Sequence, residues 1–260
     1  MGERAVLLPA EGRWPDGVDV WRVAIAETAV DFPYLDDDER ARARRFLRAS
    51  DRIRFATTRS VLRELLARYA GARPEDLRFC AGPHGRPELA PLAISGLSWP
   101  GQSGAAQSEA GLSSGPLSFN VSHAHDEAMI AISRTHTVGV DIEYIKPGFD
   151  WPPLIPLVCT EQETRALHAC AQAAGEDAAR ARFFRCWTAK EAVLKTLGLG
   201  ITEGLQALDI DLEKDGPQFP LVRENPRFAA AAAVRLHWVK GMPGYMACVA
   251  SLAGAPAGKA

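Results

Sequence analysis

Apolar and polar residues alternate along residues 18–27, VDVWRVAIAE, and this period of two predicts a half-buried β-strand. Other short runs rich in apolar and β-branched residues predict further strands. These runs lie at 117–123, 128–133, 137–145, 205–213, 228–239 and 244–252. The Met-Pro-Gly turn between the last two runs predicts that they form a hairpin.

Helical periodicity marks four other segments. A helix is predicted to begin near Asp36, because acids occupy its first turn and arginines follow, an order that suits the helix dipole. In residues 52–71 the apolar positions recur at helical spacing, and Gly71 is placed to end the helix. Helices are also predicted at 160–173 and 177–197.

The grouping of these elements indicates the fold class. Strands and helices do not alternate strictly, which favours an α+β fold with mostly antiparallel sheets. The order strand, helices, strands occurs twice, before and after about residue 136, so we expect two similar α+β halves, 1–135 and 136–260. Residues 94–118 contain seven Ser, five Gly and two Pro, which predicts a mobile surface loop.

Composition narrows the functional classes. The 260 residues are 47% hydrophobic and 24% charged, with a net charge of −2, as in a globular protein with a substantial core. This balance argues against a general nucleic-acid or membrane-surface binder, and no apolar run reaches the roughly 20 residues that cross a bilayer. No signal-peptide pattern is found, and five cysteines without a CxxC pair favour a reduced, cytoplasmic setting in which they are small buried side chains.

Residues 40–54 carry seven arginines against one acid, Asp51. The planar guanidinium binds phosphate through paired hydrogen bonds, so this segment is a candidate phosphate-binding surface. The alternative is a solvated helix face whose arginines pair with the acids at 36–39.

Two carboxylates are the strongest chemical signal. Asp141 and Glu143 stand two apart on a predicted strand, so both side chains lie on one face, and Val140 and Ile142 are expected to face a core. A shared cation would relieve the repulsion between the carboxylates, and oxygen ligands suit Mg²⁺. The alternative is an ordinary exposed strand face.

Glu191 and Lys195 add a second pair, within FFRCWTAKEAVLK at 183–195. They are four residues apart and share a helix face, beside aromatic residues that would anchor the helix. Glu191 is a candidate third metal ligand and Lys195 a candidate phosphate contact. The alternative is a surface ion pair of a kind common in helices.

Ser122 and His123 are neighbours on a predicted strand and point to opposite faces, so they do not form a nucleophile–base pair. The GxSxG pattern of hydrolases is also missing at this position. His123 and His125 are expected to share a face, but the third ligand of a zinc site is missing at suitable spacing, and ordinary core or surface histidines are the alternative.

Together these motifs, NVSH at 120–123, VGVDIE at 138–143 and WTAKEAVLK at 187–195, resemble the 4′-phosphopantetheinyl transferases of the long, monomeric Sfp type. The resemblance covers roughly residues 30–210. It implies a pseudo-dimer of two α+β halves with the active site between them. It also implies transfer of 4′-phosphopantetheine from coenzyme A to a serine of an apo acyl, peptidyl or aryl carrier protein, the holo-[acyl-carrier-protein] synthase reaction, with release of 3′,5′-ADP.

The resemblance assigns the reacting groups by motif position. Asp141, Glu143 and Glu191 match the ligands of Mg²⁺, for which Mn²⁺ is an alternative. Lys195 matches the lysine at the pyrophosphate, and Ser122 lies in the segment along the phosphates. Either Glu191 or a metal-held water would take the proton of the carrier serine, and Asp141 and Lys195 complete the catalytic group.

The resemblance also assigns the nucleotide end of coenzyme A. Arg42, Arg54 and His123 match basic groups around the 3′-phosphate. Gly85 and Arg86 match the turn beside the adenine, although the long insertion that follows departs from compact members. Carrier proteins of fatty-acid, polyketide and nonribosomal-peptide synthesis are all candidate partners.

Two rival functions stay open at the level of the sequence. One is a non-catalytic module that senses coenzyme A or binds a carrier protein; the complete set of three carboxylates and a lysine counts against it. The other is a nucleic-acid binder that uses the arginine-rich segment. It predicts aromatic residues interleaved with the basic ones, yet only Phe46 and Phe55 are present.

Overall fold

The computed structural model describes residues 4–25, 32–82, 86–90, 117–200, 204–222 and 225–254. Two features predicted from the sequence lie outside this part of the chain: the Ser/Gly-rich loop up to residue 116, and Gly85. Within the described residues the fold is α+β with antiparallel sheets, as predicted.

The first sheet has four strands in the order β1-β2-β6-β5, and each neighbouring pair is antiparallel. The strands are β1 (Ala5–Leu7), β2 (Val18–Ala24), β5 (Ser118–Ala124) and β6 (Glu127–Ser133). The predicted strands at 18–27, 117–123 and 128–133 are confirmed, although β2 ends at Ala24. The β5–β6 hairpin turns at His125 and Asp126, with His125 at a left-handed φ of 52°.

Two helices follow β2: the second packs on this sheet, and the first packs on the second. Helix α1 (Asp37–Arg44) is capped by Asp36, whose carboxylate accepts a hydrogen bond from the backbone N–H of Glu39. The Glu39 carboxylate accepts one from the backbone N–H of Asp36 in return. Helix α2 (Ala49–Ala70) ends at Gly71, which has a left-handed φ of 63°. Both helices are confirmed. A 3₁₀ turn η1 (Pro74–Asp76) and a small sheet of β3 (Phe79–Ala81) and β4 (Pro87–Leu89) follow.

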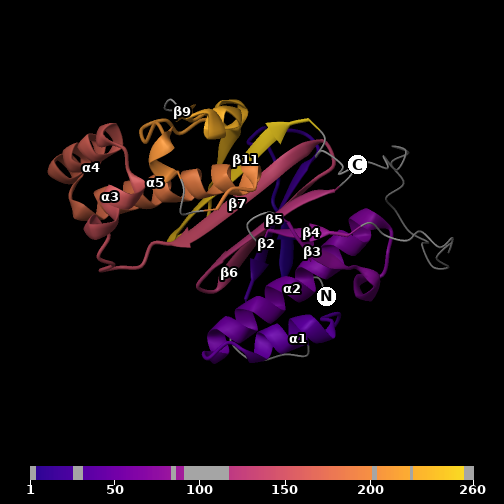
Figure 1. Cartoon of the computed structure of the whole chain (residues 1–260). Coiled ribbons are helices and arrows are strands. Elements are labelled where there is room, and N and C mark those ends of the chain that lie inside the picture. The colour runs from indigo at the N-terminus through magenta and orange to yellow at the C-terminus, as the bar shows by residue number, and fades with distance from the viewer. Residues whose placement is uncertain are drawn as a thin grey trace.

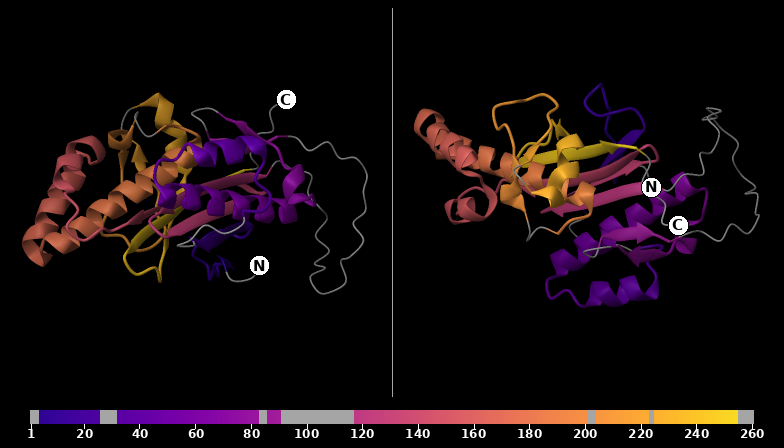
Figure 2. Two further views of the ribbon diagram at one scale, coloured as in Figure 1. Left: turned by 90° about the horizontal axis from the view of Figure 1, so that it is seen from below. Right: turned by 45° about the horizontal axis from the view of Figure 1, so that its top comes forward.

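The second sheet has three strands in the order β10-β11-β7. They are β7 (His136–Tyr144), β10 (Arg235–Val239) and β11 (Tyr245–Ala253), and the predicted β10–β11 hairpin is confirmed. A turn η3 (Pro152–Leu154) and helices α3 (Ile155–Val158), α4 (Glu161–Ala174) and α5 (Glu176–Leu197) connect β7 to the rest of this part. Helices α3, α4 and α5 lie at one end of the molecule and α1 and α2 at the other (Figure 1), and both views of Figure 2 keep them apart.

Two of the predicted strands are wrong in part. Residues 205–213 form a turn η5 (Leu205–Ala207) and only a short strand β8 (Leu208–Asp209), paired with β9 (Leu221–Val222). The first half of 228–239 is a 3₁₀ helix, η6 (Pro226–Ala233). The reason is local, because a proline pre-organises the start, the Asn225 side chain caps it, and alanine favours helix over strand.

Each sheet buries one face against helices. Leucines of α2 pack on β2 and β6 in one core, and α5 packs on β7 and β11 in another. A third core lies between the two sheets and contains Met129 and Ala131 of β6 together with Val138, Val140 and Ile142 of β7. The expectation that Val140 and Ile142 face a core is therefore confirmed.

Strands β5 and β7 lie side by side, and side chains join them. The backbone N–H of Val138 donates to Ser118 Oγ at 3.1 Å, and that of Val140 donates to Asn120 Oδ1 at 3.0 Å. Ser118, Asn120 and Ser122 share one face of β5 because they are spaced by two. This polar row ties the first sheet to the strand that carries Asp141.

Candidate active site

Strand β7 positions the two carboxylates as their spacing predicted. Asp141 and Glu143 point away from the core that holds Val140 and Ile142, toward the side of the sheet covered by α5. Asp141 is only 3% exposed, whereas Glu143 is half-buried. A carboxylate so deeply buried needs compensating partners.

Helix α5 supplies those partners. The Lys195 ammonium donates to Asp141 Oδ1 at 2.6 Å and to Ser122 Oγ at 3.1 Å. The Ser122 hydroxyl in turn donates to the same Oδ1 atom at 2.8 Å. Glu191 lies one turn before Lys195 on the same helix and is buried. The structure therefore brings together groups from β5, β7 and α5.

The three carboxylates carry more negative charge than the one ammonium, and they are partly or fully shielded from water. Burial, and then repulsion by Asp141, raises the pKa of Glu143 to about 7, and Glu191 adds to this repulsion. Burial and Asp141 likewise raise the pKa of Glu191 to about 7. Lys195 acts in the opposite direction on both groups, and a hydrogen bond from the Trp187 side chain also lowers the pKa of Glu143. One ammonium does not balance three carboxylates.

Two oxygens of the group identify where a cation fits. Asp141 Oδ2 and Glu191 Oε1 are buried and have no hydrogen-bond partner among the described residues. A buried carboxylate oxygen without a partner is costly, and a bound cation removes that cost. The donors are all carboxylate oxygens, which suit a hard cation such as Mg²⁺. The residues present thus fit a divalent metal ion.

A second cluster of potential ligands is already neutralised. Ligand atoms of Cys159, Glu163 and Cys186 lie within 4.8 Å of one another and are all buried. However, the Lys190 ammonium lies 2.5 Å from Glu163 Oε2, so its positive charge already compensates this carboxylate. The other Glu163 oxygen accepts the backbone N–H of Ile210. This cluster holds the fold together and is not the candidate metal site.

Basic groups lie beside the carboxylate site, on the first sheet and α2. Arg54 Nε donates to the backbone carbonyl of His125 at 2.9 Å, and its Nη1 pairs with Asp51 at 2.9 Å. His123 is exposed, yet partial desolvation and then the charges of Arg54 and Lys195 lower its pKa. His123 therefore lies between the Lys195 side and the arginine side of the site.

His125 corrects one expectation. Strand β5 ends at Ala124, so His125 lies in the hairpin turn and does not continue the face of His123. Its ring stacks on Tyr144 with 4.7 Å between centroids, and its Nδ1 lies 3.0 Å from Asp126. The alternation of faces expected for a strand does not apply here, because His125 has a left-handed backbone conformation and begins the turn that reverses the chain.

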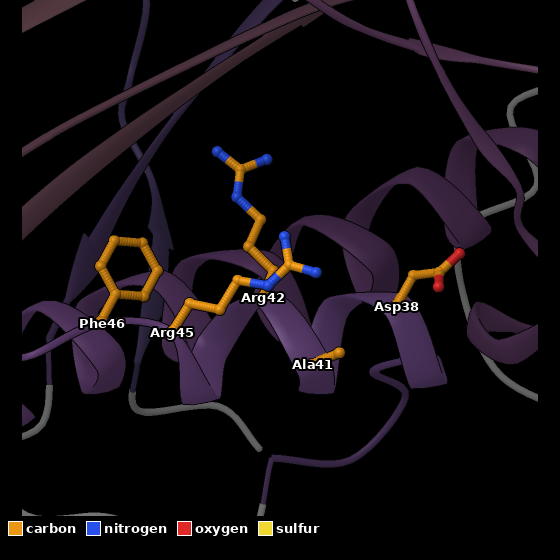
Figure 3. Close-up of a pocket in the computed structure, with 5 residues that line it drawn as sticks. All are labelled: Asp38, Ala41, Arg42, Arg45 and Phe46. Carbon is orange, nitrogen blue, oxygen red and sulfur yellow. The ribbon is translucent and has the colours of Figure 1, made fainter.

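Arg42 lies farther along the basic surface. Its guanidinium sits over the ring of Phe55 on α2, 5.1 Å from the centroid. It also lines a hollow of about 670 Å³ with Asp38, Ala41, Arg45 and Phe46. Figure 3 shows the side chains of Arg42, in α1, and of Arg45, at its C-terminal end, pointing to the same side. Asp141, Glu143 and Glu191 are not among the described residues that line this hollow.

The side chain of Arg86 bonds to backbone atoms of other elements and does not simply lie at the surface. Its guanidinium donates to the backbone carbonyls of Lys195, Phe119 and Val138. Sequence analysis identified the residue only by its place in a turn. It missed the bonds across the molecule, because no local spacing signals them. The row Ser118, Asn120 and Ser122 did have a signal, the alternation of polar residues on a strand.

Comparisons with known proteins agree with this geometry. Residues 137–250 match the model of the 4′-phosphopantetheinyl transferase superfamily. The chain is 31% identical over 207 residues to the 4′-phosphopantetheinyl transferase HetI of Nostoc sp., across 78% of this chain and 77% of that protein. The chain belongs to the 4′-phosphopantetheinyl transferase superfamily.

Other relatives extend the match. This transferase is 33% identical over 171 residues to a putative 4′-phosphopantetheinyl transferase of Synechocystis sp., across 66% of this chain and 60% of that protein. It is 26% identical over 219 residues to a phosphopantetheinyl transferase of Thraustochytrium sp., across 77% of this chain and 68% of that one. The resemblance seen in the motifs is thereby confirmed, and the predicted reaction, transfer of phosphopantetheine from coenzyme A to a carrier protein, is the one that this membership supports.

The family match runs from β7 to β11, so it includes Asp141, Glu143, Glu191 and Lys195 of this transferase. The basic residues Arg42 and Arg54 precede it. A search of the described helices finds none that is long and apolar enough to cross a membrane.

Proposed function

We propose that this transferase moves 4′-phosphopantetheine from coenzyme A to a serine of an apo acyl, peptidyl or aryl carrier protein, as a holo-[acyl-carrier-protein] synthase. It acts as a cytoplasmic monomer with its site between the halves 1–135 and 136–260. The observation that carries the proposal is the contact of Lys195 with the buried Asp141, whose charge helps to raise the pKa values of Glu143 and Glu191 to about 7.

Asp141, Glu143 and Glu191 hold Mg²⁺, with Mn²⁺ as an alternative ion. The support is the pair of buried, unpartnered oxygens on Asp141 and Glu191 and the raised pKa values of Glu143 and Glu191. When bound, the ion supplies positive charge that offsets the charge of the pyrophosphate.

The chain's own residues move the proton and hold the leaving group. The oxygen of the carrier serine attacks the phosphorus that bears pantetheine, and the bond from that phosphorus to 3′,5′-ADP breaks. The serine proton passes to Glu191 or to a water held beside it. Lys195 stabilises the negative charge that develops on 3′,5′-ADP, and Ser122 holds the ammonium in place.

The nucleotide end of coenzyme A lies along the basic surface. Arg42, Arg54 and His123 bind the 3′-phosphate; the support is that His123 lies within reach of the charges of both Arg54 and Lys195. Gly85 and Arg86 belong to the turn beside the adenine. The serine that reacts belongs to the partner, so the chain needs no nucleophile of its own.

Mass spectrometry of a panel of apo carrier proteins tests the reaction. Each carrier is incubated with the protein, coenzyme A and Mg²⁺, and we expect at least one to gain the mass of one phosphopantetheinyl group. Asp141→Asn should abolish the gain in mass. The control is Asp150→Asn, which changes an exposed acid of the following loop and should leave the gain intact. Binding of coenzyme A without mass gain on any carrier would instead favour the non-catalytic module.

A further inference from the structure

One side chain connects three elements of the active site. Arg86 Nη1 donates to the carbonyl of Lys195 at 2.6 Å and reaches that of Thr196 at 3.4 Å, both in the last turn of α5. Its Nη2 donates to the carbonyl of Phe119 on β5 at 2.9 Å and to that of Val138 on β7 at 3.0 Å. These elements carry Lys195, Ser122 and Asp141.

The chemistry of arginine suits this position. The last carbonyls of a helix lack partners within the helix, and a positive charge there is favoured by the helix dipole. The planar guanidinium presents several N–H groups in fixed directions, so it can hold carbonyls from three elements at once. Burial lowers the pKa of Arg86, but the group stays charged because an arginine pKa begins above 12.

The contact reaches the reacting groups through the backbone. Arg86 binds the carbonyl of the same residue whose ammonium bonds to Asp141 and Ser122. Its own carbonyl accepts the backbone N–H of Gly82, which ties Arg86 to the end of β3. Thus the guanidinium sets the distance between the end of α5 and the two strands.

We propose that Arg86 is a positioning residue, which clamps the end of α5 against β5 and β7 so that Lys195 meets Asp141 and Ser122. The proposal rests on the proposed function for its kinetic consequence and on the structure alone for the clamp. It adds a role to the one that the resemblance implied, a place in the turn beside the adenine.

The experiment compares Arg86→Met and Arg86→Lys with a matched control, Arg78→Met. Arg78 also donates to backbone carbonyls, those of Glu75 and Leu77, but it is exposed and bonds only to its own segment. Three quantities are measured below the melting temperature of each variant: kcat and KM for carrier modification, the affinity for 3′,5′-ADP in the absence of Mg²⁺, and amide hydrogen exchange at residues 196–199.

We expect Arg86→Met to lower kcat by about 10–100-fold, the usual effect of losing a residue that orients reacting groups. The affinity for 3′,5′-ADP should stay within about twofold, since a residue that acts only on positioning removes no ground-state contact. Amide exchange at 196–199 should rise about tenfold or more, because that turn loses its clamp. Arg86→Lys should recover part of kcat, and Arg78→Met should match the wild type in all three.

Three results would overturn the proposal. The first is an unchanged kcat in Arg86→Met. The second is a loss of 3′,5′-ADP affinity equal to the loss in kcat/KM, which would make Arg86 a nucleotide contact. The third is unchanged amide exchange at 196–199. This last measurement needs no transfer reaction, so it judges the clamp even if the wild type modifies no carrier and the proposed function fails. If Arg86→Met does not fold, Arg86→Lys carries the same comparisons.

Discussion

The Lys195 ammonium lies 2.6 Å from Asp141 Oδ1, although the two residues are 54 positions apart in the chain. The contact satisfies one oxygen of Asp141 and leaves Oδ2 without a partner among the described residues. The two oxygens of this carboxylate are thus unequal: Oδ1 accepts from the ammonium, and Oδ2 is the atom available to the proposed metal ion.

This geometry ranks the three carboxylates. Asp141→Ala should be the most damaging substitution, because it removes the proposed metal ligand and the partner of both Lys195 and Ser122. Glu143→Ala should be the mildest, since Glu143 is only half-buried. For Asp141→Ala we expect a loss of transfer on the order of a hundredfold or more. Removing a residue that only supports a metal ligand already costs up to about a hundredfold, and losing a ligand should cost at least as much. Steady-state kinetics across a Mg²⁺ titration measure it, with Asp150→Ala as the control, and normal activity of Asp141→Ala would refute the metal assignment.

The basic surface makes a distinct prediction about ligands. If Arg42 binds the 3′-phosphate, Arg42→Glu should weaken coenzyme A about tenfold to hundredfold and leave 3′-dephospho-coenzyme A almost unchanged, as expected for a charged contact of about 1.5–3 kcal/mol. His123→Ala should show the same selectivity. Lys195→Ala should not, because both ligands contain the pyrophosphate. Calorimetry at fixed salt measures the affinities; equal losses for the two ligands in Arg42→Glu would return the arginines to a solvated face.

Gly139 is needed where α5 crosses β7. A Cβ atom at this position would lie 2.3 Å from the carbonyl oxygen of Ala192 and 2.6 Å from the backbone nitrogen of Thr196, both in α5. Gly139→Ala should push the helix away and separate Lys195 from Asp141. We expect a loss of about 1–3 kcal/mol in the free energy of unfolding, typical of overpacking, together with reduced transfer. Chemical denaturation measures it against Gly216→Ala, where a Cβ atom meets nothing within 4 Å.

His237 predicts how stability responds to acid. Burial lowers its pKa to about 4, from the ordinary value near 6.5, with Ser251 Oγ 3.3 Å from Nε2 and the positive charge of Arg235 nearby. Between these two values the unfolded chain binds a proton that the folded protein excludes. Stability from this group is therefore complete above pH 6.5 and falls as the pH drops toward 4, by about 3 kcal/mol in all.

The matching experiment is denaturation at a series of pH values for wild type and His237→Leu. The variant should lose the part of the slope between pH 6.5 and 4 that belongs to His237, whereas His168→Leu, an exposed histidine of α4, should keep it. If stability depended on pH identically in wild type and His237→Leu, folding would not suppress the protonation of His237, and the prediction would be wrong.

The sequence by itself determined what depends on short spacing. Asp141 and Glu143 share a face because strand residues two apart do so, and Glu191 and Lys195 share a face because helix residues four apart do so. The caps at Asp36 and Gly71 were predicted from the same kind of local rule. Local rules also misled, at η6 and at His125, where a proline-alanine run and a tight turn replaced the expected strand.

The tertiary structure alone decided which of these pairs meet. Nothing in the spacing states that Lys195 contacts Asp141, that Asp141 Oδ2 has no partner among the described residues, or that Arg86 reaches carbonyls 33 to 110 positions away. Such contacts depend on how α5 packs on β7 and how β5 lies against β7, and packing is fixed by the shapes of whole buried faces. The pKa values near 7 of Glu143 and Glu191 follow from that packing too, because burial and a neighbouring charge exist only in the folded chain.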